Sequence, residues 1–485
     1  MRRLLTALSA GLLVLNATAP ARAQTPPSPP AVVPWATPSD AEIHDILVQR
    51  IDVEHSGVGV VVGVIDARGR RFVSYGVSDK RDPKPVGPRT VFEIGSMTKV
   101  FTSLVLSEMV QDGEVKLDDP VAKYLPPGTK IPERNGKQIT LVDIATQSSG
   151  LPRMPSNFTP KDWDNPYADY GEAQLFQFLA GYSLPRDIGS KYEYSNLAVG
   201  LMGDALARRA GVDYETLVKR RIIEPLRMTS TTITLSPALK ARLAQGHDSA
   251  LDPVANWDFG ILPGQGALAG AGALRSDAED ILTFLGAELG YVKTPLAAAM
   301  KAEWTSVRRP AAPGLSVALG WHISSPPGRD EIVWHNGGTG GYRTYMGFDP
   351  KTGVGVVVLT NAATGRGGDD IGAHILNGAP LQPPPPDPAA GRHAVALDPK
   401  ALDLYVGRYQ LAPQVFLTVT HDGDRFVTQI TGQPHAAIFP ESRTDFFYRI
   451  VDAQLRFDLP ASGPASGVTL HQAGRDLVAK RVVEP

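Results

Sequence analysis

A run of four prolines, Pro383-Pro384-Pro385-Pro386, divides this chain of 485 residues into two parts of different character. Proline lacks a backbone N–H and fixes its own φ, so such a run continues neither a helix nor a central strand. The sequence therefore predicts a proline-rich linker over residues 381–397. A large domain at residues 39–380 precedes it, and a smaller domain at residues 398–485 follows it.

The large domain has strand patterns at both of its ends. Ser39-Asp40-Ala41-Glu42 is a capping box that predicts a helix to about Ile51, and strand-like runs follow at 58–65 and 71–77. Near residue 380 the order is mirrored, with strands around 332–335, 342–348 and 354–359 and then a helix at 369–376. Residues 96–320 between them read as mostly helical, with a second capping box at Ser276-Asp277-Ala278-Glu279. The pattern predicts an α+β fold: one antiparallel sheet flanked by the terminal helices, plus a helical subdomain.

The part after the linker contains short alternating runs separated by turns. Such runs occupy residues 416–420, 426–430, 446–450 and 455–459, and His421-Asp422-Gly423-Asp424 is a hairpin signal. This spacing predicts a small all-β domain, which we expect to be an eight-stranded barrel.

The first 23 residues have the pattern of a secretory signal peptide. Arg2 and Arg3 precede an apolar run at residues 4–15, and Ala21-Arg22-Ala23 is a cleavage signal. The apolar run is shorter than a bilayer span, which disfavours a retained membrane anchor. A proline-rich leader follows at residues 24–38. We therefore expect a periplasmic or secreted protein.

Charge and composition exclude several classes of partner. Removal of the signal peptide takes away three arginines and no acidic residue, so the formal net charge changes from −2 to −5. With no basic run, nucleic acid is not an expected partner. There is no cysteine, so lipid attachment at cysteine and disulfides are ruled out. The histidines show no zinc-binding spacing, and we expect neither a metal nor another cofactor.

Ser96-Met97-Thr98-Lys99 is the only S-x-x-K sequence in the chain. It follows a short apolar run that ends in Gly95 and precedes a helix-like segment, so Ser96 is expected at the first turn of a helix with Lys99 one turn later. Serine needs an adjacent base to act as a nucleophile, and lysine serves only if its pKa is lowered. Taken alone, the motif is more typical of a helix-capping serine followed by a solvated lysine than of a catalytic pair.

Two further motifs follow in order. Tyr194-Ser195-Asn196 is the only Y-x-N, and Trp334-His335-Asn336-Gly337-Gly338 follows an apolar run. With these three motifs, residues 39–380 resemble the penicillin-recognising serine hydrolases. The branch most similar holds class C β-lactamases, serine D-Ala-D-Ala carboxypeptidases, D-aminopeptidases and β-lactamase-like esterases. In the same way, residues 398–485 resemble the lipocalin-like modules attached to some of these peptidases.

The resemblance implies a role for each motif residue. Ser96 is the acylated nucleophile, Lys99 accepts its proton directly or through Tyr194, and Tyr194 acts as phenolate or as hydrogen-bond relay. For substrate binding, the resemblance implies Asn196, His335, Gly337 and Gly338. His335 replaces the usual lysine of the third motif and is expected to keep the site electropositive. The N–H groups of Ser96 and Gly338 are expected to form the oxyanion hole.

Three other sequence features bear on these roles. Lys351-Thr352-Gly353 spells the usual third motif, but Asp349-Pro350 before it and an apolar run after it predict a hairpin turn instead. His322 is expected to be a structural strand residue beside the cleft. The loops near 151–169 and 256–272 are expected to determine specificity.

The sequence thus predicts a serine hydrolase whose substrates are D-amino-acid peptides, β-lactams or related amides and esters. The alternative is a catalytically weak protein that binds penicillins or peptidoglycan fragments. Amide, ester and lactam acylation use the same groups, so the sequence leaves the bond open. It also leaves open the oligomeric state, and whether the β domain restricts access, mediates assembly or acts as a spacer.

Overall fold

The computed structural model describes residues 35–260, 264–384, 386–413, 415–422, 425–433 and 435–482. The expected signal peptide at 1–23 and most of the leader lie outside the described residues. Among the helices that are described, none has the length and apolar character needed to cross a membrane.

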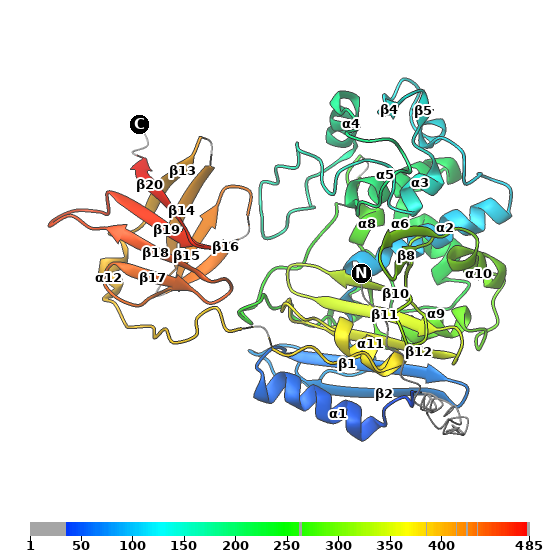
Figure 1. Cartoon of the computed structure of the whole chain (residues 1–485), viewed down its shortest axis with the longest axis horizontal. Coiled ribbons are helices and arrows are strands. Elements are labelled where there is room, and N and C mark those ends of the chain that lie inside the picture. Colours follow the sequence, from blue (N-terminus) through cyan, green and yellow to red (C-terminus); the bar gives the residue numbers. More distant parts are fainter. Residues whose placement is uncertain are drawn as a thin grey trace, which may run out of the picture. The chain divides into compact units, whose positions relative to one another are not determined.

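The large domain is built on an eight-stranded antiparallel sheet, whose strand order is β2-β1-β12-β11-β10-β9-β8-β7 (Figure 1). The strands are β1 (Gly59–Asp66), β2 (Gly69–Gly76), β7 (Arg309–Ala312), β8 (Leu315–Val317), β9 (His322–Ser324), β10 (Ile332–Gly338), β11 (Arg343–Asp349) and β12 (Val354–Thr360). β1 pairs with β12, with Val60 opposite Thr360. The expected closure of one sheet by both ends of the domain is therefore confirmed.

Helices cover both faces of this sheet. α1 (Asp40–Val48) and α11 (Asp369–Asn377) share one core with the strand residues Val62 and Val356. α9 (Ala278–Glu288) packs on the opposite face with Val61, Val357 and Leu359. Alternate residues of β1 and β12 thus enter different cores, as the two-residue period of a strand requires. Both strands are buried, which explains their unbroken apolar sequence.

The predicted cap of α1 is present, whereas that of α9 lies one residue later than predicted. Ser39 and Glu42 form both hydrogen bonds of the capping box, and the helix continues as a π-helical turn, η1 (Gln49–Val53). At α9 the N-cap is Asp277, whose carboxylate accepts from the Asp280 N–H at 2.9 Å. Ser276 instead ends the short strand β6 (Arg275–Ser276), and its hydroxyl is hydrogen-bonded to Thr231.

The residues between the two halves of the sheet form the predicted helical subdomain. Its helices are η2 (Gly95–Met97), α2 (Thr98–Gln111), η3 (Val121–Tyr124), α3 (Leu141–Ala145), α4 (Glu172–Gly181), α5 (Asn196–Ala210), α6 (Tyr214–Val218), η4 (Lys219–Ile223), α7 (Pro237–Lys240), α8 (Ala269–Gly272) and α10 (Ala297–Thr305). Two small ladders join β3 (Phe92–Glu93) to β6 and β4 (Glu133–Arg134) to β5 (Lys137–Gln138). α2 lies at the centre of this region, and nearly every one of its residues is buried.

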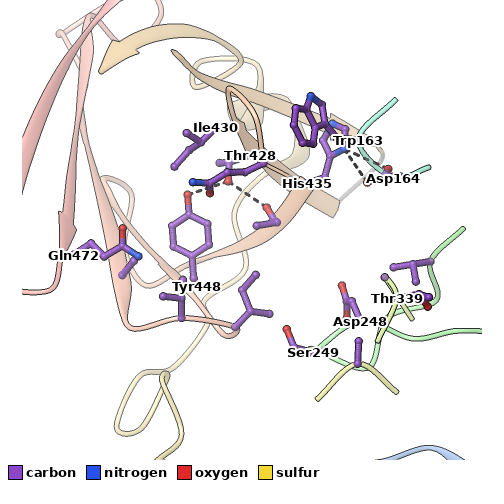
Figure 2. A pocket seen from close by; sticks show the side chains of 18 of the residues that line it. Trp163, Asp164, Asp248, Ser249, Thr339, Thr428, Ile430, His435, Tyr448 and Gln472 are labelled. Carbon is purple, nitrogen blue, oxygen red and sulfur yellow. Dashed lines mark hydrogen bonds and ion pairs between the residues drawn. The ribbon is translucent and has the colours of Figure 1, made fainter. Parts of the chain in front are cut away.

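The C-terminal part is a closed barrel of eight antiparallel strands, as predicted. After α12 (Pro399–Leu402) come β13 (Gly407–Ala412), β14 (Val415–Asp422), β15 (Arg425–Ile430), β16 (His435–Pro440), β17 (Asp445–Tyr448), β18 (Ala453–Asp458), β19 (Gly467–Gln472) and β20 (Arg475–Val482). Aromatic side chains, including Tyr405, Phe446 and Phe457, fill its core. Figure 2 shows Thr428 and Tyr448, whose hydroxyls are 2.9 Å apart. The expected hairpin at 421–424 joins β14 to β15, although Gly423 and Asp424 lie outside the described residues.

The Lys351-Thr352-Gly353 sequence forms the turn between β11 and β12. Asp349 is paired with Val354, and Gly353 has φ +74°. The Lys351 side chain is exposed and pairs with Asp330. The prediction of a hairpin turn at this position is confirmed.

Candidate active site

Ser96 lies in the single turn η2, directly before α2. The turn is preceded by β3, which pairs with β6, and the Met97 N–H donates to the Ile94 carbonyl at 3.2 Å. Ser96 is therefore held at the N-terminal end of a buried 14-residue helix, as predicted. Unpaired N–H groups and a partial positive charge are available at such an end.

Gly95 brings this turn against the edge of β10. Its φ is +50°, and a Cβ at this position would lie 2.7 Å from the Gly338 nitrogen. A side chain here would push the two segments apart and would also adopt a strained conformation. The glycine therefore permits the close approach of the Ser96 turn to the Gly338 N–H.

Lys99 contacts Ser96 from the next turn of the helix. Its amine donates to the Ser96 hydroxyl at 3.0 Å and to the Ala271 carbonyl of α8 at 2.6 Å. The side chain is completely buried, and burial, with the nearby charge of Arg153, lowers the pKa of Lys99 well below its ordinary value. A lowered pKa increases the share of neutral amine, which is the form that a general base requires.

Tyr194 lies above Lys99, with the amine 4.8 Å from its ring centroid. Burial raises the pKa of Tyr194, so the phenol is protonated near neutral pH. Burial thus lowers the pKa of Lys99 and raises the pKa of Tyr194, so it favours the neutral form of each side chain. These directions are compatible with Lys99 as the proton acceptor and Tyr194 as a hydrogen-bonding relay, the roles that the resemblance implies.

The loop that follows α3 holds the Tyr194 segment in place through hydrogen bonds to its main chain. Gln147 has φ +54°, and its carbonyl and side-chain oxygens accept from the Glu193 and Ser195 N–H groups at 2.7 and 2.8 Å. Ser195 caps α5 and donates its hydroxyl to the Pro152 carbonyl at 2.6 Å. A non-glycine residue in the left-handed region persists only where surrounding contacts fix it. The tyrosine segment is thus fixed on both sides.

Asn196 presents an unused acceptor to the site. Its amide nitrogen lies 3.4 Å from the Tyr167 hydroxyl and 3.6 Å from the Met154 sulfur. Its Oδ1 is buried and has no hydrogen-bond partner among the described residues. An unpaired buried oxygen is costly, and an N–H group of a substrate would satisfy it.

His335 differs from the expectation of a cationic residue. It is 1% exposed, and burial lowers its pKa well below the ordinary value, with His322 and Lys99 adding to the effect. Its Nδ1 is 2.6 Å from the Asn336 carbonyl, and its ring centroid is 6.3 Å from that of Tyr194. His335 is therefore neutral at neutral pH and does not supply the charge that its motif position suggested.

The two glycines of the third motif have different surroundings. A Cβ at Gly337 would lie 2.0 Å from the Ile94 carbonyl oxygen, so packing against the Ser96 turn by itself requires a glycine here. Gly338 is exposed at the end of β10. Asn336 points away from Ser96, because alternate strand residues face opposite sides, and it donates to Asp369 of α11 at 2.5 Å.

A narrow cavity of about 90 Å³ opens beside Ser96. Of the predicted site residues, Ser96, Asn196 and Gly338 line it. The two loops that we expected to determine specificity contribute Arg153 and Tyr167 from one side and Trp257, Phe259 and Gly272 from the other. Tyr167 stacks on Phe259 with ring centroids 4.5 Å apart. The sequence indicated these loops but not the individual side chains, since a single arginine or aromatic residue in a loop carries no motif.

His322 has the structural role expected of it. It is 7% exposed, its Nε2 is 3.1 Å from the Tyr192 hydroxyl, and its ring stacks on Trp334 at 5.0 Å. Burial lowers the pKa of His322 to about 4. Within the described residues no group of acidic, histidine or cysteine side chains has the arrangement of a metal site.

Comparisons with known proteins agree with this geometry. A family described as "Beta-lactamase" matches residues 44–379, and a domain of unknown function (DUF3471) matches residues 391–481. The D-alanyl-D-alanine-carboxypeptidase/endopeptidase AmpH of Escherichia coli is 33% identical over 339 residues, which cover 66% of this chain and 83% of that protein. Penicillin-binding protein 4* of Bacillus subtilis is 25% identical over 426 residues, covering 84% of this chain and 91% of that protein.

A solved structure of a similar protein has the same fold as the large domain. The β-lactamase/D-alanine carboxypeptidase from Yersinia pestis, complexed with citrate, aligns with a TM-score of 0.57 at 28% sequence identity. The alignment covers 67% of this chain and 92% of that chain.

Proposed function

The chain belongs to the β-lactamase family and is a serine hydrolase of the β-lactamase/DD-peptidase type, and we propose that it cleaves D-amino-acid peptides and β-lactams through an acyl-enzyme on Ser96. The contact that supports this proposal best is the 3.0 Å distance between the buried Lys99 amine and the Ser96 hydroxyl, which is short enough for proton transfer. The same contact makes Ser96 a nucleophile whichever of the two substrates is bound.

The proposed reaction starts with attack of Ser96 Oγ on the substrate carbonyl while its proton passes to Lys99 Nζ. The N–H groups of Ser96 and Gly338 stabilise the oxyanion of the tetrahedral intermediate. As the carbonyl re-forms, the C–N bond breaks, and the proton reaches the leaving nitrogen from Lys99 through the Tyr194 hydroxyl. Water then attacks the ester with the same groups acting in reverse, which releases the acid and restores Ser96.

Asn196 favours an amide-containing substrate over a simple ester. Its unpartnered Oδ1 accepts a hydrogen bond, and a peptide or an acylamino β-lactam supplies an N–H group there. A short-chain ester has no such donor and would leave the oxygen unpaired. We therefore place esters last among the candidate substrates.

The test is covalent labelling followed by a turnover panel. A fluorescent penicillin should add one acyl group to the wild-type protein, and Ser96→Ala should abolish labelling without changing the thermal unfolding midpoint. An adduct that persists in Ser96→Ala, seen by intact mass spectrometry, would contradict the proposal. The panel compares a chromogenic cephalosporin, a D-Ala-D-Ala peptide, a D-amino-acid anilide and a p-nitrophenyl ester.

The panel also decides between an enzyme and a catalytically weak binding protein. An enzyme releases many equivalents of product from at least one substrate, whereas a weak binder stops after one equivalent and keeps the adduct. The N-terminal sequence pattern supports a periplasmic or secreted location, which we include in the proposal. Detection of the mature N-terminus at Gln24 in a periplasmic extract would test it.

A further inference from the structure

We propose that Arg153 is the anion-binding residue of this active site and holds a carboxylate carried on the acyl half of the substrate. The inference rests on the proposed function, because it assumes a substrate that reacts at Ser96. It adds a substrate class: acyl donors with an acidic side group.

The other cations near the third motif are not available for this role. His335 is buried and neutral. Lys351 lies in the turn between β11 and β12, where it pairs with Asp330. The Arg343 guanidinium donates to the carbonyls of Thr339 and Tyr342 at 2.8 and 2.9 Å. The position that a family lysine would occupy therefore carries no charge in this chain.

Arg153 lies at the opening of the same cavity. It is exposed, it lines the cavity with Ser96 and Asn196, and its guanidinium carbon is 5.0 Å from the Tyr194 ring centroid. In the part of the chain that the structure describes, no acidic side chain forms an ion pair with it. A guanidinium is always charged and presents a planar set of donors that fits a carboxylate.

Hydrogen bonds fix the main chain of Arg153, so the position of its Cα is defined. Its carbonyl accepts from the N–H groups of Asn196 and Leu197 at 3.0 and 3.3 Å, at the N-terminal end of α5. This contact places Arg153 next to Asn196. A substrate whose amide N–H reaches Asn196 Oδ1 therefore carries its acyl side group towards Arg153.

Arg153 also acts on the catalytic groups, and a test must separate the two effects. Its charge lowers the pKa of Lys99, so its removal changes acylation by every substrate. A ratio of rates for two matched acyl donors cancels this general effect, because the second donor differs only by the carboxylate.

The experiment uses benzylpenicillin and its α-carboxy derivative, carbenicillin, with second-order acylation rates measured by intact mass spectrometry. We expect Arg153→Met to lower the carbenicillin-to-benzylpenicillin ratio by about tenfold or more, on the scale of a charge-assisted hydrogen bond. Arg153→Lys should give an intermediate ratio. Arg329→Met, which removes an exposed arginine at the β9–β10 turn, is the matched control and should leave the ratio unchanged. An unchanged ratio in Arg153→Met would overturn the proposal.

A binding measurement keeps the inference separate from the proposed chemistry. In the Ser96→Ala background, calorimetry compares acetylated tripeptides that end in D-Ala-D-Ala and begin with glutamate or glutamine. We expect preference for the glutamyl peptide, and loss of that preference when Arg153→Met is added. If neither penicillin acylates the wild type, the proposed function is wrong. The peptide affinities still show whether Arg153 binds a carboxylate. Equal affinities in Ser96→Ala, or a preference that survives Arg153→Met, would refute the role of Arg153.

Discussion

At the scale of single residues, burial changes the pKa values of Lys99 and Tyr194 in opposite directions. Desolvation disfavours the charged form of each group, so it lowers the lysine pKa and raises the tyrosine pKa. A protonated phenol passes a proton on rather than accepting one first. Of the two roles that the sequence left open for Tyr194, we therefore propose the hydrogen-bond relay.

The relay can be tested with Tyr194→Phe, which removes the hydroxyl and keeps the ring. We expect kcat to fall roughly 10²-fold or more, the scale of general acid–base contributions. Tyr291→Phe removes a hydroxyl that is bonded to the Gly353 carbonyl far from Ser96, and it serves as the control. A near wild-type kcat for Tyr194→Phe would reduce Tyr194 to a packing residue.

His322 predicts a pH dependence of stability. Its folded-state pKa is about 4, below the ordinary value of 6.5, so the unfolded chain binds the proton more readily. Its stabilising contribution is therefore present above pH 6.5 and is lost as the pH falls through about 4. Between pH 7 and pH 5 the loss is about 2 kcal/mol.

His322→Phe keeps a flat ring against Trp334 and removes the titration. We expect urea unfolding of the variant to depend less steeply on pH than that of the wild type over this interval. The absolute stability also changes, because the Tyr192 contact is lost, so the slopes are compared and not the midpoints. Parallel pH profiles would show that His322 is not the titrating group.

The sequence named candidate residues that belong to a motif, and it did not name those that only the fold brings to the site. Ser96, Lys99 and Tyr194 are brought together as expected, because their motifs lie at the starts of helices that face one cavity. Burial of His335 lowers its pKa and disfavours the charge expected there, and this burial depends on distant strands. No sequence motif around Arg153 indicated that it belongs to the site, because its position is set by contacts with α5.

At the scale of elements, the active site depends on how closely η2 approaches β10. The strands and terminal helices were predictable from their period and caps, whereas this approach was expected only from the family resemblance, which places the Ser96 and Gly338 N–H groups together. It is a contact between segments more than 200 residues apart, for which the chain's local patterns offer only the glycines at 95 and 337. The cap of α9 was misplaced for a similar reason, because Ser276 is used by a tertiary hydrogen bond to Thr231.

Gly95→Ala tests this approach. The new methyl group would meet the Gly338 nitrogen at 2.7 Å, which separates the two N–H groups of the proposed oxyanion hole. Loss of one such donor costs roughly 10²–10³-fold in rate, and we expect acylation to slow by that factor. Gly113→Ala imposes a similar backbone strain, at φ +73°, with no atom near the methyl group. Equal acylation rates in the two variants would show that the close contact does not matter.

At the scale of the whole molecule, the residues that the structure describes form separate hydrophobic cores. Among these residues, two cores belong to the large domain and reach Leu381, and another is formed by residues 397–479 of the barrel region. Each part can therefore bury its own apolar surface, as an independent folding unit requires. The lipocalin-like resemblance of the barrel remains a prediction, since the matching family is a domain of unknown function.

A chain that ends near Pro386 tests what the barrel contributes. All three motifs precede the linker, so we expect the shortened protein to fold and to be acylated at Ser96 at a rate within a few-fold of the full chain. If the barrel restricts access to the cleft, its removal should shift preference towards bulkier substrates in the same panel, whereas an unchanged preference favours a spacer. Circular dichroism and thermal unfolding provide the folding control. Complete loss of acylation in a well-folded truncation would show that the barrel supplies part of the active site, because no other change separates the two proteins.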